Sequence, residues 1–346
     1  MRKKVLVALS GGVDSAVCAY LLKSRGYDVT GIMLRLFDKP DSHDAQDAQL
    51  LCQKLDIPFV YPDYREKFRT LVIDRFADSY RKGLTPNPCV DCNRYVKLPF
   101  VFDYADKEGF DFVATGHYAR VVYSSEYGLY QLLKGVDSSK DQSYVLYNLT
   151  QDMLARLILP VGELNKSWVR DIAASLNIGL ESKKDSQDIC FISGDYYDYL
   201  RDYCGVTLES GDFIDAHGNV LGRHKGAVCY TRGQRKGLGL ALPQPMYVLS
   251  KDMVSNTVTL GFNEDLYTNL VTAIDVNFVS VREISSGLSV TARVRYNQPE
   301  QQGTAFVDDK GNLCVRFDTP QRAVTAGQSL VLYQGDVLIA GGIIIS

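Results

Sequence analysis

The turn SGGVDS at residues 10–15 is the strongest candidate for chemistry in the sequence. It follows a buried apolar run and leads into a helical pattern. The backbone N–H groups of Gly11, Gly12 and Val13 can converge on an anion, and the start of the helix adds its positive end. The hydroxyls of Ser10 and Ser15 can donate further hydrogen bonds. The turn therefore predicts a binding site for a phosphate or pyrophosphate group.

The turn lacks a lysine, which the usual P-loop places just before its Ser or Thr to reach the β- and γ-phosphates. A loop without it suits an enzyme that grips the pyrophosphate portion of ATP while reaction occurs at the α-phosphate. Asp14 is not a phosphate ligand by itself, but it could hold the loop or help to position a magnesium ion. The alternative is a plain glycine-containing turn between a strand and a helix.

The cysteines are the second set of residues that could do chemistry. The chain has eight, and Cys89 and Cys92 form a C-x-x-C element. That spacing fits a redox pair or, with a third cysteine, an iron–sulfur site. Structural zinc needs four good ligands, and no second close pair is evident. No secretory signal precedes these scattered cysteines, so a reducing cytoplasm is favoured over a disulfide framework.

The elements that must position these residues alternate between strands and helices. Strands are expected at Val5–Leu9, Val29–Leu36, Phe59–Tyr61 and Asp111–Thr115. Helices are expected at Val13–Arg25, Ala45–Leu55 and Tyr64–Lys82, and, after a Pro-rich loop, near Pro99–Glu108. This alternation predicts a parallel sheet covered on both faces, with ligands beyond the carboxyl ends of its strands.

The rest of the chain predicts two smaller domains. We expect a catalytic domain at 1–203, a Gly-rich linking domain at 204–264 and a C-terminal antiparallel β-barrel at 265–346. The 346 residues are 46% apolar, and no apolar run reaches the length of a membrane span. A net charge of −3 gives no global attraction to nucleic acid, so RNA would need a local patch. The basic stretch Gly222–Gly237, with Tyr230 inside it, is such a patch or else a solvated loop.

Several long motifs add a family resemblance. The turn SGGVDS resembles that of the PP-loop ATP pyrophosphatases. In chain order, TPNPCVDCNRYVK, ATGHYAR, KDQSYVLYNL, LPVGELNKSWVRDIA, DSQDICFI and TRGQRKGLGL resemble the bacterial tRNA-specific 2-thiouridylases. The resemblance implies an α/β fold, in which a parallel-sheet PP-loop (adenine nucleotide alpha-hydrolase-like) domain precedes a small linking domain and a C-terminal β-barrel. It also implies ATP-dependent 2-thiolation of the wobble uridine of tRNA, with release of AMP and pyrophosphate.

The resemblance also implies site residues. ATP would be bound at Ala8, Leu9, Ser10, Gly11, Gly12, Val13, Asp14, Ser15, Leu34 and Gly116, and Mg²⁺ would be a second cofactor. Cys190 would carry sulfur as a persulfide, and Cys92 would attack it. Asn87, Pro88 and Cys89 would border the target base. The anticodon loop of tRNA would contact Lys140, Asp141, Gln142, Arg295 and Tyr296. A relay protein or a cysteine desulfurase would supply the sulfur.

Cys89 departs from the family pattern, because the family commonly has aspartate there. Asp91 could partly replace that carboxylate. A 4Fe-4S cluster held by Cys89, Cys92 and Cys190 is an alternative to the persulfide route. Two rival functions remain open: a PP-loop enzyme that adenylates a small metabolite, and a non-catalytic RNA- or metal-binding protein.

Overall fold

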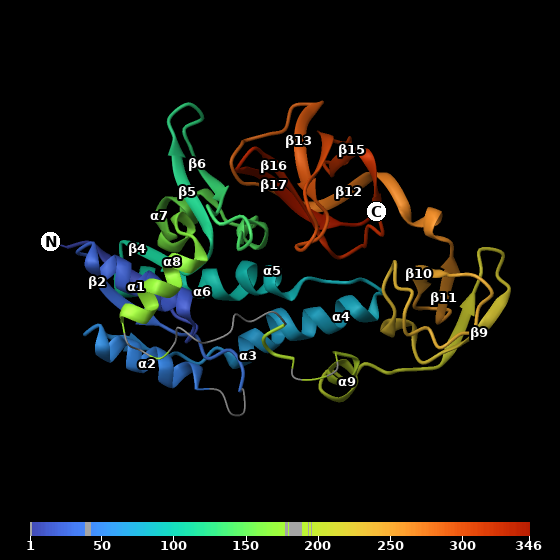
Figure 1. The fold of residues 1–346 in the computed structure, drawn as a ribbon, viewed down its shortest axis with the longest axis horizontal. Coiled ribbons are helices and arrows are strands. Elements are labelled where there is room, and N and C mark those ends of the chain that lie inside the picture. The colour runs from blue at the N-terminus through green and yellow to red at the C-terminus, as the bar shows by residue number, and fades with distance from the viewer. Residues whose placement is uncertain (1, 39–42, 177–178, 180–188, 193, 195) are drawn as a thin grey trace.

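The fold is that of a computed structural model, which describes residues 2–38, 43–176, 179, 189–192, 194 and 196–346. Three β-sheets organise this part of the chain, and Figure 1 shows them as separate bodies joined by long helices and connecting segments. The predicted order of a parallel α/β domain, a small linking domain and a C-terminal barrel is confirmed.

The first sheet has the strand order β3-β2-β1-β4-β7, and all its strands are parallel. Its strands are β1 (Lys4–Ala8), β2 (Asp28–Ile32), β3 (Phe59–Val60), β4 (Phe112–Thr115) and β7 (Leu157–Ile158). The covering helices include α1 (Val13–Ser24), α2 (Asp44–Lys54), α6 (Leu98–Glu108) and α8 (Lys166–Ser175). Val5, Leu6 and Val7 of β1 are fully buried, as a central parallel strand requires.

Two long helical runs contain π-helical segments. One consists of α3 (Arg65–Phe68), η1 (Arg69–Asp74) and α4 (Arg75–Arg81), and the other of α5 (Pro88–Cys92), η2 (Asn93–Lys97) and α6. The expected helix near Pro99 therefore begins at Pro88, and both nearby cysteines lie on a helix. The side chain of Asn87 accepts hydrogen bonds from two backbone N–H groups, and Pro88 occupies the first turn.

The linking domain contains a four-stranded sheet in the order β10-β11-β8-β9. Its elements are α9 (Tyr196–Asp202), β8 (Gly211–Ile214), β9 (Val220–His224), η5 (Ala227–Cys229), β10 (Tyr247–Asp252) and β11 (Thr257–Gly261). Phe76 and Tyr80 of α4 belong to the same buried cluster as Phe213 and Val248. The run ending in α4 therefore joins the catalytic domain to the linking domain (Figure 1).

Six antiparallel strands form the C-terminal barrel, which closes because β12 pairs with β17. After η6 (Asn263–Leu266) these strands are β12 (Tyr267–Phe278), β13 (Leu288–Arg293), β14 (Gln301–Val307), β15 (Leu313–Arg322), β16 (Ser329–Gln334) and β17 (Val337–Ile344). The hairpin of β5 (Ala119–Ser124) and β6 (Leu129–Lys134), which the sequence did not predict, extends this sheet by pairing β6 with β17. Three short helices, η3 (Ser143–Leu146), α7 (Gln151–Arg156) and η4 (Pro160–Glu163), follow the hairpin.

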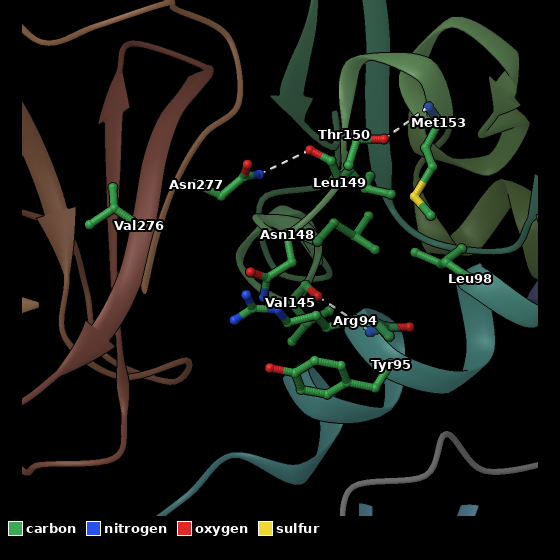
Figure 2. A pocket seen from close by; sticks show the side chains of 12 residues that line it. Arg94, Tyr95, Leu98, Val145, Asn148, Leu149, Thr150, Met153, Val276 and Asn277 are labelled. Carbon is green, nitrogen blue, oxygen red and sulfur yellow. Dashed lines mark hydrogen bonds between the residues drawn. The ribbon is translucent and has the colours of Figure 1, made fainter. Parts of the chain in front are cut away.

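Hydrogen bonds and an ion pair fasten the barrel to the catalytic domain. Asn277 of β12 donates from Nδ2 to the carbonyl oxygens of Tyr147 and Leu149 at 2.7 and 3.0 Å, the second of which is visible in Figure 2. Arg94, one turn beyond the cysteines, pairs with the carboxylate of Asp275. The barrel is thus held against the helical run that carries Cys89 and Cys92. Across the described ranges, no helix is long and apolar enough to cross a membrane.

Candidate functional site

The SGGVDS turn lies between the carboxyl end of β1 and the first turn of α1. Ser15 Oγ accepts a hydrogen bond from Ser10 N at 3.2 Å and donates to the carbonyl of Gly12 at 3.1 Å. Gly11 has φ +70°, and a Cβ there would lie only 2.7 Å from Asp44 Cα at the start of α2. The backbone of the turn is thus held in a conformation that only glycine permits at this position.

The other residues expected at the ATP site surround this turn. Gly116 follows β4, and a Cβ at that position would lie 2.7 Å from Ser15 N, so the two loops touch through their backbones. Ala8 and Leu34 are partly buried and pack against one hydrophobic cluster, while Leu9 is buried in another. The structure therefore brings Gly116 directly to the turn and places these three apolar side chains in the supporting core.

Two residues that the sequence did not indicate fix the Asp14 carboxylate. The hydroxyl of Tyr118 donates to Asp14 Oδ1 at 2.7 Å, and Lys166 Nζ lies 2.7 and 2.8 Å from the two carboxylate oxygens. Lys166 comes from the start of α8 and its side chain is only 10% exposed. The turn lacks a lysine in its own sequence, but the fold supplies a cation from a distant segment.

Both cysteines of the C-x-x-C element lie on α5, three residues apart, so their side chains lie on the same side of this helical run. Cys92 is buried, and this burial is the main reason why its pKa rises to about 12. The positive charge of Lys97 opposes the rise, while charge on Cys190 or Cys89 would increase it. Cys190 and Cys89 are exposed. The buried thiol of Cys92 is thus close enough to both exposed cysteines to interact with them electrostatically.

The side chains do not form a ready metal site. Among the residues that the structure describes, no group of three or more His, Cys, Asp and Glu side chains is placed to hold a metal ion. All three cysteines of the expected iron–sulfur set lie within those residues, so their arrangement does not fit a preformed cluster site. The DSQD part of the motif before Cys190 lies outside the described residues.

Asp91 does not replace the carboxylate that the family has in place of Cys89. Two residues along a helix correspond to about 200°, so Asp91 projects away from the side that carries the cysteines. Its carboxylate interacts with the charges of Arg75, Arg94 and Asp275, while burial raises its pKa. The suggestion that Asp91 takes over the missing role is therefore not supported by its position.

His117 follows Gly116 directly, and Lys97 interacts electrostatically with His117 and with the two cysteines of α5. The Nδ1 atom of His117 is 2.7 Å from Thr115 Oγ1, and its pKa falls to about 3, chiefly through burial and further through the charge of Lys97. His117 is therefore neutral at physiological pH. Burial raises the pKa of both Cys92 and Cys89, and the charge of the same lysine opposes that rise, so Lys97 is a shared source of positive charge that the sequence did not single out.

The residues expected around the target base have different surroundings. Asn87 Oδ1 caps α5 by accepting from Cys89 N at 3.1 Å, and Pro88 is buried. Tyr296, from the barrel, is close enough for charge on Cys89 to raise its pKa, although burial is the larger cause. The structure thus brings a barrel residue expected to contact tRNA next to a catalytic-domain residue expected to border the base.

The residues expected to contact tRNA lie on both sides of this junction. Asp141 is buried and accepts hydrogen bonds from Gly135 N and Ser143 N at 3.2 and 3.1 Å, so its side chain organises the loop. Tyr296 donates from its hydroxyl to the carbonyl of Asp141 at 3.3 Å. Arg295 donates to the carbonyl of Ala323 at 3.2 Å and is mostly enclosed, which lowers its pKa.

The basic stretch of the linking domain is only partly available to a ligand. Arg232 is part-buried and donates to the carbonyl oxygens of Leu249 and Asp265, and Tyr230 is buried. Arg223 pairs with Asp212 at 2.9 Å. Arg235 and Lys236 are exposed. The interpretation of the whole stretch as a phosphate-binding patch is therefore restricted to its exposed cations, and Tyr230 cannot serve as a stacking platform.

A cavity of about 290 Å³ lies where the cysteine-bearing helical run meets the barrel (Figure 2). Leu98, Val145, Leu149, Met153 and Val276 give it apolar walls. The Asn93 amide donates to the carbonyl of Val145 at 3.4 Å, while its buried Oδ1 has no hydrogen-bond partner. The cavity begins one residue after Cys92, so it adjoins the thiol site without containing it.

Comparison with known families gives three matches in chain order. Residues 3–194 match the tRNA methyl transferase HUP domain, and residues 197–262 match the tRNA methyl transferase PRC-barrel domain. Residues 268–344 match the Aminomethyltransferase beta-barrel domain. The three matches correspond to the parallel sheet, the sheet of the linking domain and the six-stranded barrel, and the β5–β6 hairpin lies within the first match.

Curated relatives match along their whole length. A tRNA-specific 2-thiouridylase MnmA of Clostridioides difficile is 42% identical, and the match covers 99% of this chain and 98% of the relative. The protein of the same name from Carboxydothermus hydrogenoformans is 44% identical with the same coverage. A third, from Lachnoclostridium phytofermentans, is 42% identical and is matched over 99% of both chains.

Proposed function

This chain belongs to the tRNA-specific 2-thiouridylase family, and from that membership we propose that it thiolates the wobble uridine of tRNA at C2, using ATP. ATP adenylates the 2-carbonyl oxygen and releases pyrophosphate, because oxygen is otherwise a poor leaving group. Sulfur then attacks C2 and displaces AMP. The observation that carries the proposal is the full-length identity combined with a phosphate-binding turn and a thiol pair in one catalytic domain.

The ATP site is proposed at the SGGVDS turn and at Gly116. The N–H groups of the turn and the start of α1 can stabilise negative charge on the pyrophosphate as it leaves. Lys166 brings an ammonium group to the same turn. A magnesium ion bound with ATP would neutralise phosphate charge, and Asp14 is the carboxylate of this turn that could contact it.

The sulfur is proposed to travel as a persulfide on Cys190, which is exposed and therefore accessible to a donor protein. Deprotonated Cys92 attacks the Sγ of Cys190, the sulfur–sulfur bond of the persulfide breaks, and hydrosulfide leaves to attack C2. The products are 2-thiouridine, AMP and a Cys92–Cys190 disulfide, which a thiol reductant must reduce before the next turnover. We propose a sulfur relay protein or a cysteine desulfurase as the donor, in the cytoplasm.

The target uridine is proposed to enter at the junction of α5 and the barrel. Asn87, Pro88 and Cys89 border this region from the catalytic domain, and Tyr296 approaches it from the barrel. Lys140, Gln142 and Arg295 lie on the segments around it and are proposed to contact the anticodon loop. An unpaired base of that loop can turn outward into an enzyme at limited cost.

The test measures pyrophosphate release from ATP with and without unmodified tRNA, followed by mass spectrometry of the digested tRNA. We expect release that depends on tRNA, and 2-thiouridine when a persulfide donor is added. An Asp14→Asn variant is the matched negative control, since it keeps the size of the side chain and removes its charge. Absence of tRNA-dependent release by the unaltered protein would overturn the proposal.

A further inference from the structure

We propose that Tyr118 and Lys166 are positioning residues for Asp14, and that through them the segment 137–142 couples tRNA binding to ATP binding. This inference rests on the proposed function, which puts ATP at the SGGVDS turn and tRNA at Lys140 and Gln142. Asp14 is the shared end point, because donors from two separate parts of the chain converge on its carboxylate.

The first connection runs through Tyr118. Its backbone N–H donates to Gln142 Oε1 at 3.0 Å, and Gln142 N donates to the carbonyl of Tyr118 at 2.9 Å. A Cβ on Gly135, two residues before the segment, would lie 2.9 Å from the same carbonyl oxygen, so the chain leading into the segment also packs closely on Tyr118. Tyr118 is 2% exposed and its hydroxyl donates to Asp14. A displacement of Gln142 therefore moves the backbone from which this hydroxyl projects.

The second connection runs through Lys166. Its backbone N–H, at the start of α8, donates to Asp137 Oδ2 at 3.0 Å. The carbonyl of Asp137 in turn accepts from Lys140 N at 3.0 Å. Lys166 Nζ then binds both oxygens of Asp14. Both connections thus start within 137–142, where tRNA is proposed to bind, and both end on one carboxylate of the ATP turn.

The carboxylate and an ATP phosphate are competing acceptors for the Lys166 ammonium, which has three protons to donate. The position of α8 and of Tyr118 sets how this ammonium and the Asp14 carboxylate are oriented toward the turn. Binding of tRNA to the segment changes that position, so it must change the affinity for ATP. Linkage requires the reverse effect to have the same size.

The test uses the full chain, unmodified tRNA and a nonhydrolysable ATP analogue. The Kd of the analogue is measured with and without saturating tRNA, and the Kd of tRNA with and without the analogue. We expect tRNA to change the Kd of the analogue by the same factor as the analogue changes the Kd of tRNA. In the unaltered protein this ratio of Kd values should be at least fivefold. Tyr118→Phe and Asp137→Ala each should lower the ratio at least twofold, and the double variant should bring it to about one.

The tRNA affinity of Tyr118→Phe in the absence of nucleotide should stay within twofold of the unaltered protein, which separates lost coupling from lost folding. Tyr123→Phe is the matched control, because Tyr123 is 56% exposed on β5, and its ratio should not change. If the unaltered protein releases pyrophosphate with tRNA but its Kd values are equal with and without the second ligand, the inference is wrong while the proposed function stands. A ratio of fivefold that survives in the double variant would also overturn the inference. Failure of the unaltered protein to release pyrophosphate would overturn the proposed function as well.

Discussion

At the scale of single residues, the buried thiol of Cys92 is the group whose environment most limits the chemistry. Its pKa of about 12, raised mainly by burial, leaves only a very small thiolate fraction at neutral pH. Attack on a sulfur–sulfur bond requires the thiolate. Lys97 is the nearby positive charge that offsets part of this effect. Sulfur transfer is therefore expected to be sensitive to pH and to that lysine.

The pH dependence can be measured in a single turnover, with protein that already carries the persulfide and with adenylated tRNA. Because the pKa of Cys92 lies far above the assay range, the thiolate fraction rises about tenfold for each pH unit from 6.5 to 8.5. We expect the sulfur-transfer rate to follow this slope. Lys97→Met removes the stabilising charge and should slow transfer at every pH. A flat profile would show that Cys92 is not the attacking group.

Cys89 can be tested separately from the two cysteines that the persulfide route needs. The three thiols do not form a metal site in this structure, so Cys89→Ser should thiolate tRNA within about threefold of the normal rate. The hydroxyl replaces an exposed thiol on the surface of α5, with little effect on packing. Cys92→Ser and Cys190→Ser should abolish thiolation. Stoichiometric iron in protein purified without oxygen, lost together with activity in Cys89→Ser, would instead establish the cluster route.

The SGGVDS turn can be proposed as a phosphate site from the sequence alone, because such a site depends on neighbouring residues and their backbone. Asp14 could be selected from that turn, but its partners could not. Lys166 is 152 residues away from it along the chain and occupies the first turn of an ordinary amphipathic helix. Tyr118 is one of 22 tyrosines. Both residues lie in motifs of the family resemblance, Tyr118 in ATGHYAR and Lys166 in LPVGELNKSWVRDIA, but nothing in either motif pairs them with Asp14. That contact arises because the parallel sheet brings α8 and the end of β4 to the same edge.

At the scale of elements, α5 shows which signals the sequence contained and which were overlooked. Asn87 before Pro88 is a good helix start, because the amide oxygen caps free N–H groups and proline tolerates the first turn. The density of prolines nevertheless suggested a loop. The β5–β6 hairpin likewise has a turn with Gly128 at φ +62°, but its pairing with β17 depends on residues about 200 positions later.

The contact between η4 and β5 provides an element-scale prediction. A Cβ at Gly162 would overlap the backbone of Ala119, and neither backbone can move without disturbing the first sheet or the hairpin. Gly162→Ala should lower the free energy of unfolding by about 2–4 kcal/mol. Gly128→Ala, at the hairpin turn with open space around it, should cost only about 1 kcal/mol. Urea unfolding followed by circular dichroism compares the two, and equal losses would contradict the argument.

At the scale of the whole molecule, the three units meet around the cysteine-bearing helical run. The run ending in α4 reaches into the core of the linking domain (Figure 1). Arg94 of η2 pairs with Asp275 of β12, and Asn277 of β12 donates to the carbonyl oxygens of Tyr147 and Leu149, the second of which is visible in Figure 2. This arrangement lets residues of the barrel and of the catalytic domain border one site. It follows from contacts between distant segments, which the sequence could suggest only through its family resemblance.

Because the net charge is −3, tRNA affinity at this scale must come from exposed local cations. Arg235 and Lys236 meet that condition, whereas Arg232 is engaged by backbone carbonyls. Replacing both exposed cations with glutamine should reduce the slope of log affinity against log salt by about two, one for each lost phosphate contact. Lys310→Gln, on the exposed turn before β15, is the control and should leave the slope unchanged. An unchanged slope in the double variant would mean that tRNA does not reach this part of the linking domain.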